Sequence, residues 1–168
     1  MTQIKIAGII EESIVDGPGI RYVLFAQGCS HNCPGCHNPH THSFEGGTMV
    51  DIDVILQQIK SNPLLDGITL SGGEPFEQAT EFVELVQEVK KMNLHVMVYT
   101  GYTYEEIRNN AHKYPNWERL LQQVDILVDG PFEINQQDYL LKFKGSKNQR
   151  IIDLVQTRIV DEIVLWMG

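Results

Sequence analysis

The chain contains 168 residues, of which 42% are hydrophobic, and its formal net charge is −9. These values are typical of a globular domain with a substantial core, and the acidic charge argues against general nucleic-acid binding and against an anionic membrane surface. The sequence has no signal peptide and no apolar stretch near the roughly 20 residues that cross a bilayer. We therefore expect residues 1–168 to form a single cytoplasmic domain with no membrane or nucleic-acid partner.

The first predicted elements lead directly to the most informative motif. An apolar stretch between Ile4 and Ile10 predicts a strand, and residues 16–19, DGPG, predict a turn. Residues 21–26, RYVLFA, are β-branched and aromatic, which favours a buried strand. The loop that follows is therefore expected at the carboxyl end of a strand, where α/β proteins place their chemistry.

Residues 28–39 read GCSHNCPGCHNP and contain all three cysteines of the protein, Cys29, Cys33 and Cys36. Thiolates spaced as C-x3-C-x2-C can converge on one metal centre. A four-iron cubane normally takes four cysteine ligands, so three cysteines would leave one iron open to a substrate. This open iron is the central prediction from the sequence.

Other interpretations of the cysteines remain open at this point. A disulfide with one leftover thiol does not fit a chain that lacks secretory features. Zinc is the stronger competitor, because one nearby histidine would complete a Cys3His site. The available histidines are His31, His37, His40 and His42. The spacing alone favours iron–sulfur only slightly.

The rest of the chain alternates between strands and helices. Strands are expected at residues 67–70, 94–99, 124–128 and 162–166, with extended flanks around a polar loop at 143–153. Helices with apolar faces are expected at residues 52–59 and 79–89, and a capping box of Thr103 and Glu106 opens a third. Such alternation predicts βαβ units and a parallel sheet. Because a complete eight-unit barrel takes about 250 residues, we expect an α/β fold with an open, partial (β/α)6-type barrel and a mostly parallel sheet.

Four of the predicted strand ends carry unusual sequences and should meet on one rim of the sheet. They are the cysteine loop, residues 71–75 (SGGEP), Thr100 and Asp129. Gly72 and Gly73 would let the backbone approach a ligand closely, and the Glu74 carboxylate could accept hydrogen bonds from an ammonium group. Each feature also has a plainer explanation: SGGEP as a strand-to-helix turn and Asp129 as a turn residue.

Together, C-x3-C-x2-C after one strand and GGEP after the next resemble the radical S-adenosylmethionine (SAM) superfamily. The sequence DGPGIRYVLFAQGCSHNCPGCHNP resembles the opening of the glycyl-radical-enzyme activases. The short length, CPGCHNP and GSKNQRIID resemble one branch of them, the activating proteins of anaerobic ribonucleoside-triphosphate reductases. The resemblance extends from about Asp16 to Asp153.

The resemblance implies a mechanism. Cys29, Cys33 and Cys36 would hold one [4Fe–4S] cluster, SAM would bind its open iron, and residues 72–75 would receive the amino group of SAM. An electron from the reduced cluster would cleave SAM to methionine and a 5′-deoxyadenosyl radical, which would take hydrogen from a glycine Cα of the reductase. The implied partners are that anaerobic reductase and a low-potential electron donor such as flavodoxin or ferredoxin.

The resemblance also implies further site residues. Arg21 is expected to be a catalytic residue, and both Arg21 and the DGPG loop are expected near the site. Gly35 stands where many superfamily members have an aromatic residue beside the adenine, so we expect the adenine to contact the Gly35–Cys36 backbone and His37. Thr100 and Asp129 are the candidates for ribose contacts.

Two rival functions remain open from the sequence. One is an activase of another glycyl-radical enzyme, such as pyruvate formate-lyase, and the other is a small zinc-stabilised protein-binding module. Because the chain is too short to close a barrel, we expect the reductase to cover the open rim. The polar run 144–150 is a candidate for part of that docking surface, although it could equally be a solvated loop or a contact to the SAM carboxylate.

Overall fold

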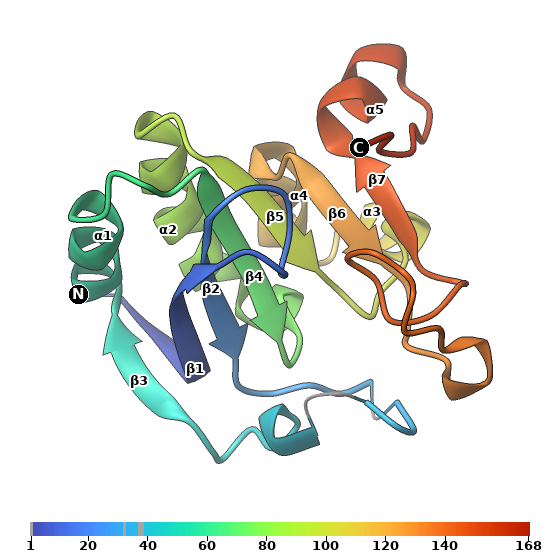
Figure 1. Cartoon of the computed structure of the whole chain (residues 1–168), viewed down its shortest axis with the longest axis horizontal. Helices are drawn as coiled ribbons and strands as arrows, with labels where there is room; N and C mark the ends of the chain where they lie inside the picture. The colour runs from blue at the N-terminus through green and yellow to red at the C-terminus, as the bar shows by residue number, and fades with distance from the viewer. Residues whose placement is uncertain (1, 32, 37–38) are drawn as a thin grey trace.

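The structure is a computed structural model that describes residues 2–31, 33–36 and 39–168. These residues form a mixed α/β fold around one seven-stranded sheet with the strand order β3-β1-β2-β4-β5-β6-β7 (Figure 1). The strands are β1 (Gln3–Ser13), β2 (Arg21–Ala26), β3 (Thr48–Asp51), β4 (Gly67–Gly72), β5 (His95–Tyr99), β6 (Ile126–Asp129) and β7 (Arg150–Asp153).

The centre of the sheet is parallel, as the alternation of strands and helices predicts. Strands β2, β4, β5 and β6 pair in parallel. The flanking strands depart from this pattern, because β1 runs antiparallel to β2, β3 to β1 and β7 to β6. Apolar periodicity identifies a strand but carries no information on its direction. Strands β3 and β7 end the order at opposite sides of the sheet, so the sheet is open.

Helices cover one face of the sheet, behind it in the view of Figure 1. They are α1 (Ile52–Lys60), α2 (Ala79–Lys91), α3 (Tyr104–Asn110) and α4 (Pro115–Gln123), while α5 (Leu154–Val160) follows β7. The α1 helix begins where the Asp51 side chain accepts the N–H of Asp53, and the predicted capping box of Thr103 and Glu106 begins α3. The apolar faces of α1, α2 and α4 pack on outward-facing strand residues such as Leu24 and Leu70 to form the main core.

The other face of the sheet carries a smaller cluster of Met97, Ile126 and Val128, with Phe143 packed against it. The loop before β2 also crosses this face (Figure 1), because a Cβ added to Gly17 would lie 2.7 Å from atoms of Arg21 and Met97. Loops rather than helices therefore cover this inner face, which leaves room for a cavity.

One predicted element is wrong. Residues 162–166 do not form a strand; Leu165 makes an isolated antiparallel bridge to Ile152 and the neighbouring residues do not extend it. The short β7 strand bends away into α5 and offers too little edge for a further strand. Among the described residues, no helix has the length and apolar character needed to cross a membrane.

Candidate functional site

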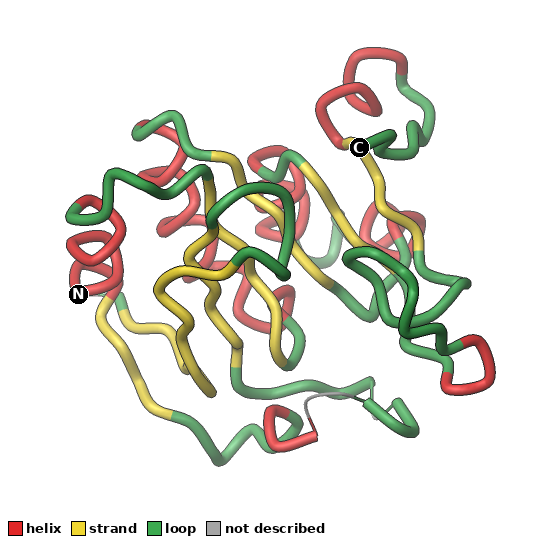
Figure 2. Tube along the Cα trace, viewed as in Figure 1, coloured by secondary structure: helices red, strands yellow, loops and turns green. Residues whose placement is uncertain are grey.

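The strand ends that carry unusual sequences meet on one rim of the sheet. Because β2, β4, β5 and β6 are parallel, their carboxyl ends point the same way. The cysteine loop follows β2, Gly73 follows β4 and Thr100 follows β5, while Asp129 ends β6. Figure 2 shows the long connections after β2 and β6, in green, on this side of the sheet. The predicted single rim is confirmed.

A cavity of about 590 Å³ opens at this rim. That volume lies within the range typical of small-molecule and cofactor sites. The predicted site residues that line it are Cys29, Cys33, Cys36, Gly72, Gly73 and Thr100. The three thiols and the glycine pair therefore face one space, although they come from two different strand ends.

The cysteine loop is closed at its base by backbone hydrogen bonds. The N–H of Gly28 donates to the carbonyl of Thr41 at 2.6 Å, and the N–H of Cys29 donates to that of His42 at 3.1 Å. Within the loop, the N–H of Cys36 donates to the carbonyl of Cys33 at 3.2 Å, which turns both side chains toward the same region. None of the three cysteines takes part in a disulfide.

Burial raises the pKa of the Cys33 thiol, a hydrogen bond with the Phe132 backbone lowers it in part, and the neighbouring Cys36 raises it further. The net shift is upward, so Cys33 is protonated at neutral pH when no metal is bound. Metal binding at this loop must therefore release a proton from Cys33.

The three thiols have the chemistry that an iron–sulfur cluster needs. Soft thiolates are the usual protein ligands of such clusters, and in a cubane each cysteine binds a different iron. Cys29, Cys33 and Cys36 line one cavity and so fit a cluster, while a single zinc ion stays the alternative. Among the described residues, no group of three Cys, His, Asp or Glu side chains is arranged to hold a metal ion.

The glycine pair after β4 is shaped by its packing against β2. The N–H of Gly73 donates to the carbonyl of Ala26 at 2.8 Å, and a Cβ at Gly73 would lie 2.5 Å from the carbonyl oxygen of Gly28. Chain packing alone therefore requires glycine here. The pair also lines the cavity, so its backbone forms a wall of the space that the cysteines line too.

Glu74 is a buried hydrogen-bond acceptor and is not among the described residues that line the cavity. Its side chain is 0% exposed and accepts hydrogen bonds from the Thr100 hydroxyl at 2.9 Å and the N–H groups of Gly101 at 2.8 Å and Phe76 at 3.0 Å. The His31 ring completes the set. The predicted contact of the Glu74 carboxylate with an ammonium group stays a prediction.

Asp129 is 1% exposed, and it too is missing from the described lining of the cavity. Its carboxylate accepts the N–H of Tyr104 at 2.7 Å, at the start of α3, and the Nε of Arg150 at 3.0 Å. In this structure Asp129 joins β6, β7 and α3. Its assignment to the ribose stays a prediction.

The structure places Arg21 at the opposite end of β2 from the cysteine loop. Arg21 begins β2, and five residue steps of about 3.3 Å place it roughly 16 Å from the end of that strand. Its side chain is 1% exposed and donates to the Thr69 hydroxyl at 2.8 Å and to the carbonyls of Pro18 at 2.8 Å and Ile68 at 2.7 Å. Arg21 anchors the turn before β2 to β4, and Asp16 of that turn lines the cavity. A catalytic role of Arg21 stays a prediction.

Of Gly35 and His37, which are predicted to contact the adenine, the structure describes only Gly35. Gly35 lies exposed in the loop with φ of +74°, and a Cβ there would meet the Ile134 side chain at 2.6 Å, so this turn requires glycine. His37 lies outside the described residues. The adenine contacts therefore stay a prediction.

Two aromatic residues of the cavity, Phe132 and Phe143, were not singled out as site residues from the sequence. Ser71 of SGGEP and Lys144 of the polar run 144–150 also line the cavity, so both predicted segments contribute to it. The contact of His31 with Glu74 joins distant parts of the chain, which the sequence does not display.

Comparison with known proteins places the chain in a family. A family model described as "4Fe-4S single cluster domain" matches residues 15–152. A protein from Vibrio cholerae is 37% identical over 146 residues, covering 82% of this chain and 90% of its own length. Relatives from Haemophilus influenzae (36% over 148 residues; 82% and 90%) and Escherichia coli (34% over 144 residues; 81% and 90%) match similarly. All three are named anaerobic ribonucleoside-triphosphate reductase-activating protein.

Among solved structures, QueE from Escherichia coli aligns with 60% of this chain and 54% of its own, at 17% identity and a TM-score of 0.47, which is too distant to bear on function. The alignments cover 90% of each relative's length, and the match to the cluster-domain model includes all three cysteines. The chain therefore belongs to the family of anaerobic ribonucleoside-triphosphate reductase-activating proteins, with a 4Fe–4S single cluster domain.

Proposed function

We propose that this protein is a radical SAM enzyme that activates an anaerobic ribonucleoside-triphosphate reductase by generating a glycyl radical on it. The observation that carries the proposal is that Cys29, Cys33, Cys36 and the Gly72–Gly73 backbone line one cavity at the carboxyl rim of the parallel strands. The family relatives support the choice of target, since their names specify this reductase.

The cysteines would hold one [4Fe–4S] cluster with one iron left for SAM. The bound cluster and SAM would supply an electron and a 5′-deoxyadenosyl radical, with methionine as the other product. The protein's own part is to bind, orient and shield these groups. The backbone around Gly72 would accept hydrogen bonds from the amino group of SAM, and Lys144, which lines the same cavity, is placed to meet its carboxylate.

The open sheet bears on how the radical is protected. We propose that residues 1–168 form a single radical SAM domain with an open, partial (β/α)6-type barrel, since β3 and β7 end the strand order without pairing to each other. A reactive radical must stay shielded from water until it meets its glycine. The reductase would therefore supply the missing wall when its glycine-bearing segment enters the cavity.

The cysteine loop also suits an exchange of electrons with a second protein. All three cysteines are partly exposed, so a cluster held there would lie near the surface. A low-potential donor such as flavodoxin or ferredoxin could approach it without a large conformational change. The exposed side of the loop is then available to the donor, while the cavity side receives SAM.

Anaerobic incubation of the reconstituted protein with the reductase, SAM and a reductant tests this function. We expect an EPR doublet of a glycyl radical on the reductase, and its absence when SAM or the cluster is omitted. Pyruvate formate-lyase serves as the matched alternative target. A radical on pyruvate formate-lyase and none on the reductase would transfer the activity to that other activase class.

A further inference from the structure

A hydrogen bond ties the cysteine loop to the rim of the sheet. His31 lies between Cys29 and Cys33, and its Nε2 is 2.6 Å from Oε1 of Glu74. An ionised carboxylate only accepts hydrogen bonds, so Nε2 carries the hydrogen and donates it. Because Glu74 is 0% exposed, this contact is shielded from water and is stronger than a similar pair on the surface.

The Glu74 carboxylate is itself fixed by its own turn and by the end of β5. It directly follows Gly73, its Oε2 accepts the N–H of Phe76 at 3.0 Å, and its Oε1 accepts the N–H of Gly101 at 2.8 Å. The Thr100 hydroxyl, at the end of β5, lies 2.9 Å from both carboxylate oxygens. The partner of His31 is therefore a buried side chain held by several hydrogen bonds directly after the Gly72–Gly73 pair.

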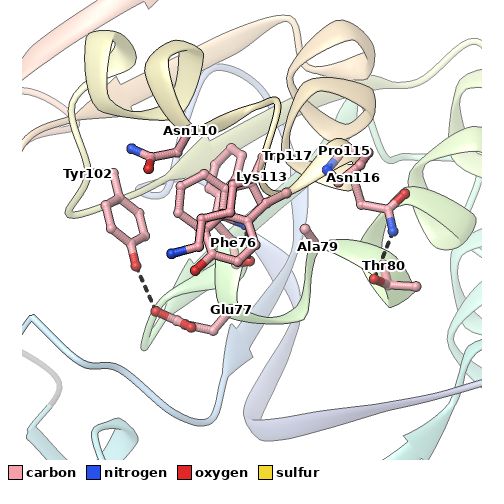
Figure 3. A pocket seen from close by; sticks show the side chains of 11 residues that line it. Phe76, Glu77, Ala79, Thr80, Tyr102, Asn110, Lys113, Pro115, Asn116 and Trp117 are labelled. Atoms are coloured by element: carbon pink, nitrogen blue, oxygen red, sulfur yellow. Dashed lines mark hydrogen bonds between the residues drawn. The ribbon is translucent and has the colours of Figure 1, made fainter.

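The His31 ring is enclosed by a second set of contacts. A Cβ at Gly101 would lie 2.5 Å from Cδ2 of His31, so the ring packs directly on that backbone. The Tyr102 ring meets it edge to face, with centroids 4.4 Å apart. The Tyr102 hydroxyl donates to Glu77 at 2.8 Å (Figure 3), and the hydroxyl of Ser30 donates to the same oxygen at 3.0 Å. Two consecutive loop residues are thus bonded to the segment after β4.

These contacts decide what kind of residue His31 is. Its Nε2 bonds to Glu74, which fixes the orientation of the ring and leaves only Nδ1 to meet any other partner. Figure 3 shows that Tyr102 and Glu77 also border a separate surface cavity of about 490 Å³ beside Trp117. The ring is held from two sides and has no need of a metal to stay in place.

We propose that His31 is a positioning residue that fixes the distance between the cysteine loop and the Gly72–Gly73 wall. This inference rests on the proposed function, in which the cluster lies on one side of the cavity and SAM must contact both sides at once. A displacement of about 1 Å between groups that must act together can reduce a rate about 100-fold. The N–H of Glu74 bonds to the carbonyl of Gly28 at 2.8 Å at the base of the loop, and the His31–Glu74 contact extends this attachment to the segment between Cys29 and Cys33 before either group binds.

The test compares His31→Gln, which keeps an N–H donor at a similar reach, with His31→Met, which has a similar size and no donor. His40→Met is the control, because His40 is exposed in the same loop and only its carbonyl bonds to Gln27. Each protein is reconstituted anaerobically and reduced, and SAM is titrated while the EPR signal of the cluster is followed. Iron content is measured in parallel.

We expect all four proteins, including the wild type, to bind the same amount of iron. The wild type, His31→Gln and His40→Met should show the same SAM-dependent change of the EPR signal. His31→Met should need at least 10-fold more SAM for half of that change, or show none.

Three outcomes would overturn the inference. If His31→Met responds to SAM as the wild type does, the His31–Glu74 contact does not position the loop. If His31→Met loses its iron while His31→Gln retains it, His31 serves cluster assembly instead. If the wild-type protein holds its cluster but shows no response to SAM, the proposed function itself fails, and this inference fails with it.

Discussion

The guanidinium of Arg150 donates to the buried carboxylate of Asp129, with Nε and Oδ1 3.0 Å apart. The same guanidinium reaches Glu105, whose side chain is 54% exposed, at the start of α3. Hydrogen bonds from Asp129 and then Glu105 raise the pKa of Arg150 above its ordinary value. The Arg150 cation therefore pairs with one buried and one exposed carboxylate, and its bond to the buried Asp129 joins β7 to β6.

This difference in burial predicts unequal effects on stability. Arg150→Gln leaves the Asp129 carboxylate buried without its cation and should lower the free energy of unfolding by about 3 kcal/mol. Glu105→Gln removes only the exposed partner and should cost less than about 1 kcal/mol. Urea unfolding followed by circular dichroism measures both values. Equal losses in the two variants would contradict the structural role assigned to Asp129.

The pH dependence of stability is predicted to depend on His95. Burial and then the Arg21 cation lower the pKa of His95; Asp125 and Asp153 raise it in part, and Lys90 lowers it again. The unfolded chain therefore takes up a proton on His95 near pH 6.5, where the folded protein resists it. The His95 contribution is fully present above about pH 6.5 and is lost as the pH falls through that value toward the lower folded pKa.

His95→Asn should flatten the loss of unfolding free energy between pH 7 and pH 5, relative to the wild type. The contributions of the carboxylates to the pH dependence are the same in both proteins and cancel in the comparison. The contribution of His31 cancels in the same way. Burial alone would lower the pKa of His31, but Glu74 raises it overall, so its contribution to stability changes with pH in the opposite direction to that of His95. Parallel stability curves for the two proteins would show that His95 is not held neutral.

The polar run 144–150 separates into residues with different surroundings. Lys144 lines the cavity and its Nζ donates to the carbonyl of Gln149 at 3.0 Å, whereas Lys147 is exposed. Lys144→Met should raise the KM for SAM about 10-fold by removing a charged hydrogen bond. Lys147→Glu should leave SAM cleavage unchanged and slow radical formation on the reductase, as expected of a docking residue.

Two rates separate these roles: reductant-driven SAM cleavage without the reductase, and glycyl-radical formation with it. If Lys147→Glu reduces both rates equally, Lys147 acts in the SAM site or in the fold. If it reduces neither, this residue is not part of the docking surface. An unchanged KM in Lys144→Met would remove Lys144 from the SAM site.

Metal content separates the proposed enzyme from a zinc-stabilised binding module. The anaerobically reconstituted protein should bind about four irons with sulfide and little zinc. Cys29→Ala, Cys33→Ala and Cys36→Ala should each abolish SAM cleavage, because each thiolate binds its own iron. Full activity in any one of these variants would contradict the cluster assignment, and stoichiometric zinc with no bound iron would favour the binding module.

The residues at the rim of the site could be predicted from the sequence better than the buried contacts behind them. The cysteine loop, Gly72 and Thr100 follow strands that are readable from their apolar runs, and parallel pairing then brings them together. Arg21 is eight positions from Cys29 in the sequence, but the whole length of β2 separates the two residues. A residue at the other end of a strand is distant in space even when it is near in sequence.

The interior contacts of the site depend on pairings that no local pattern displays. Glu74 reads as a residue of a strand-to-helix turn, and only the fold shows that His31, 43 positions earlier, points its ring at that carboxylate. From the sequence alone Asp129 is likewise interpreted as a turn residue, and only the pairing of β6 with β7 brings Arg150 beside it. Buried charges find their partners through tertiary structure, so their roles follow from the fold.

The most direct test of the central claim traces one hydrogen atom. A reductase whose glycine residues carry deuterium at Cα is incubated anaerobically with this protein, SAM and a reductant, and the 5′-deoxyadenosine formed is analysed by mass spectrometry. The account predicts that 5′-deoxyadenosine gains one deuterium as the glycyl radical appears, and that Cys33→Ala abolishes both signals. A glycyl radical that forms while 5′-deoxyadenosine stays unlabelled would contradict it.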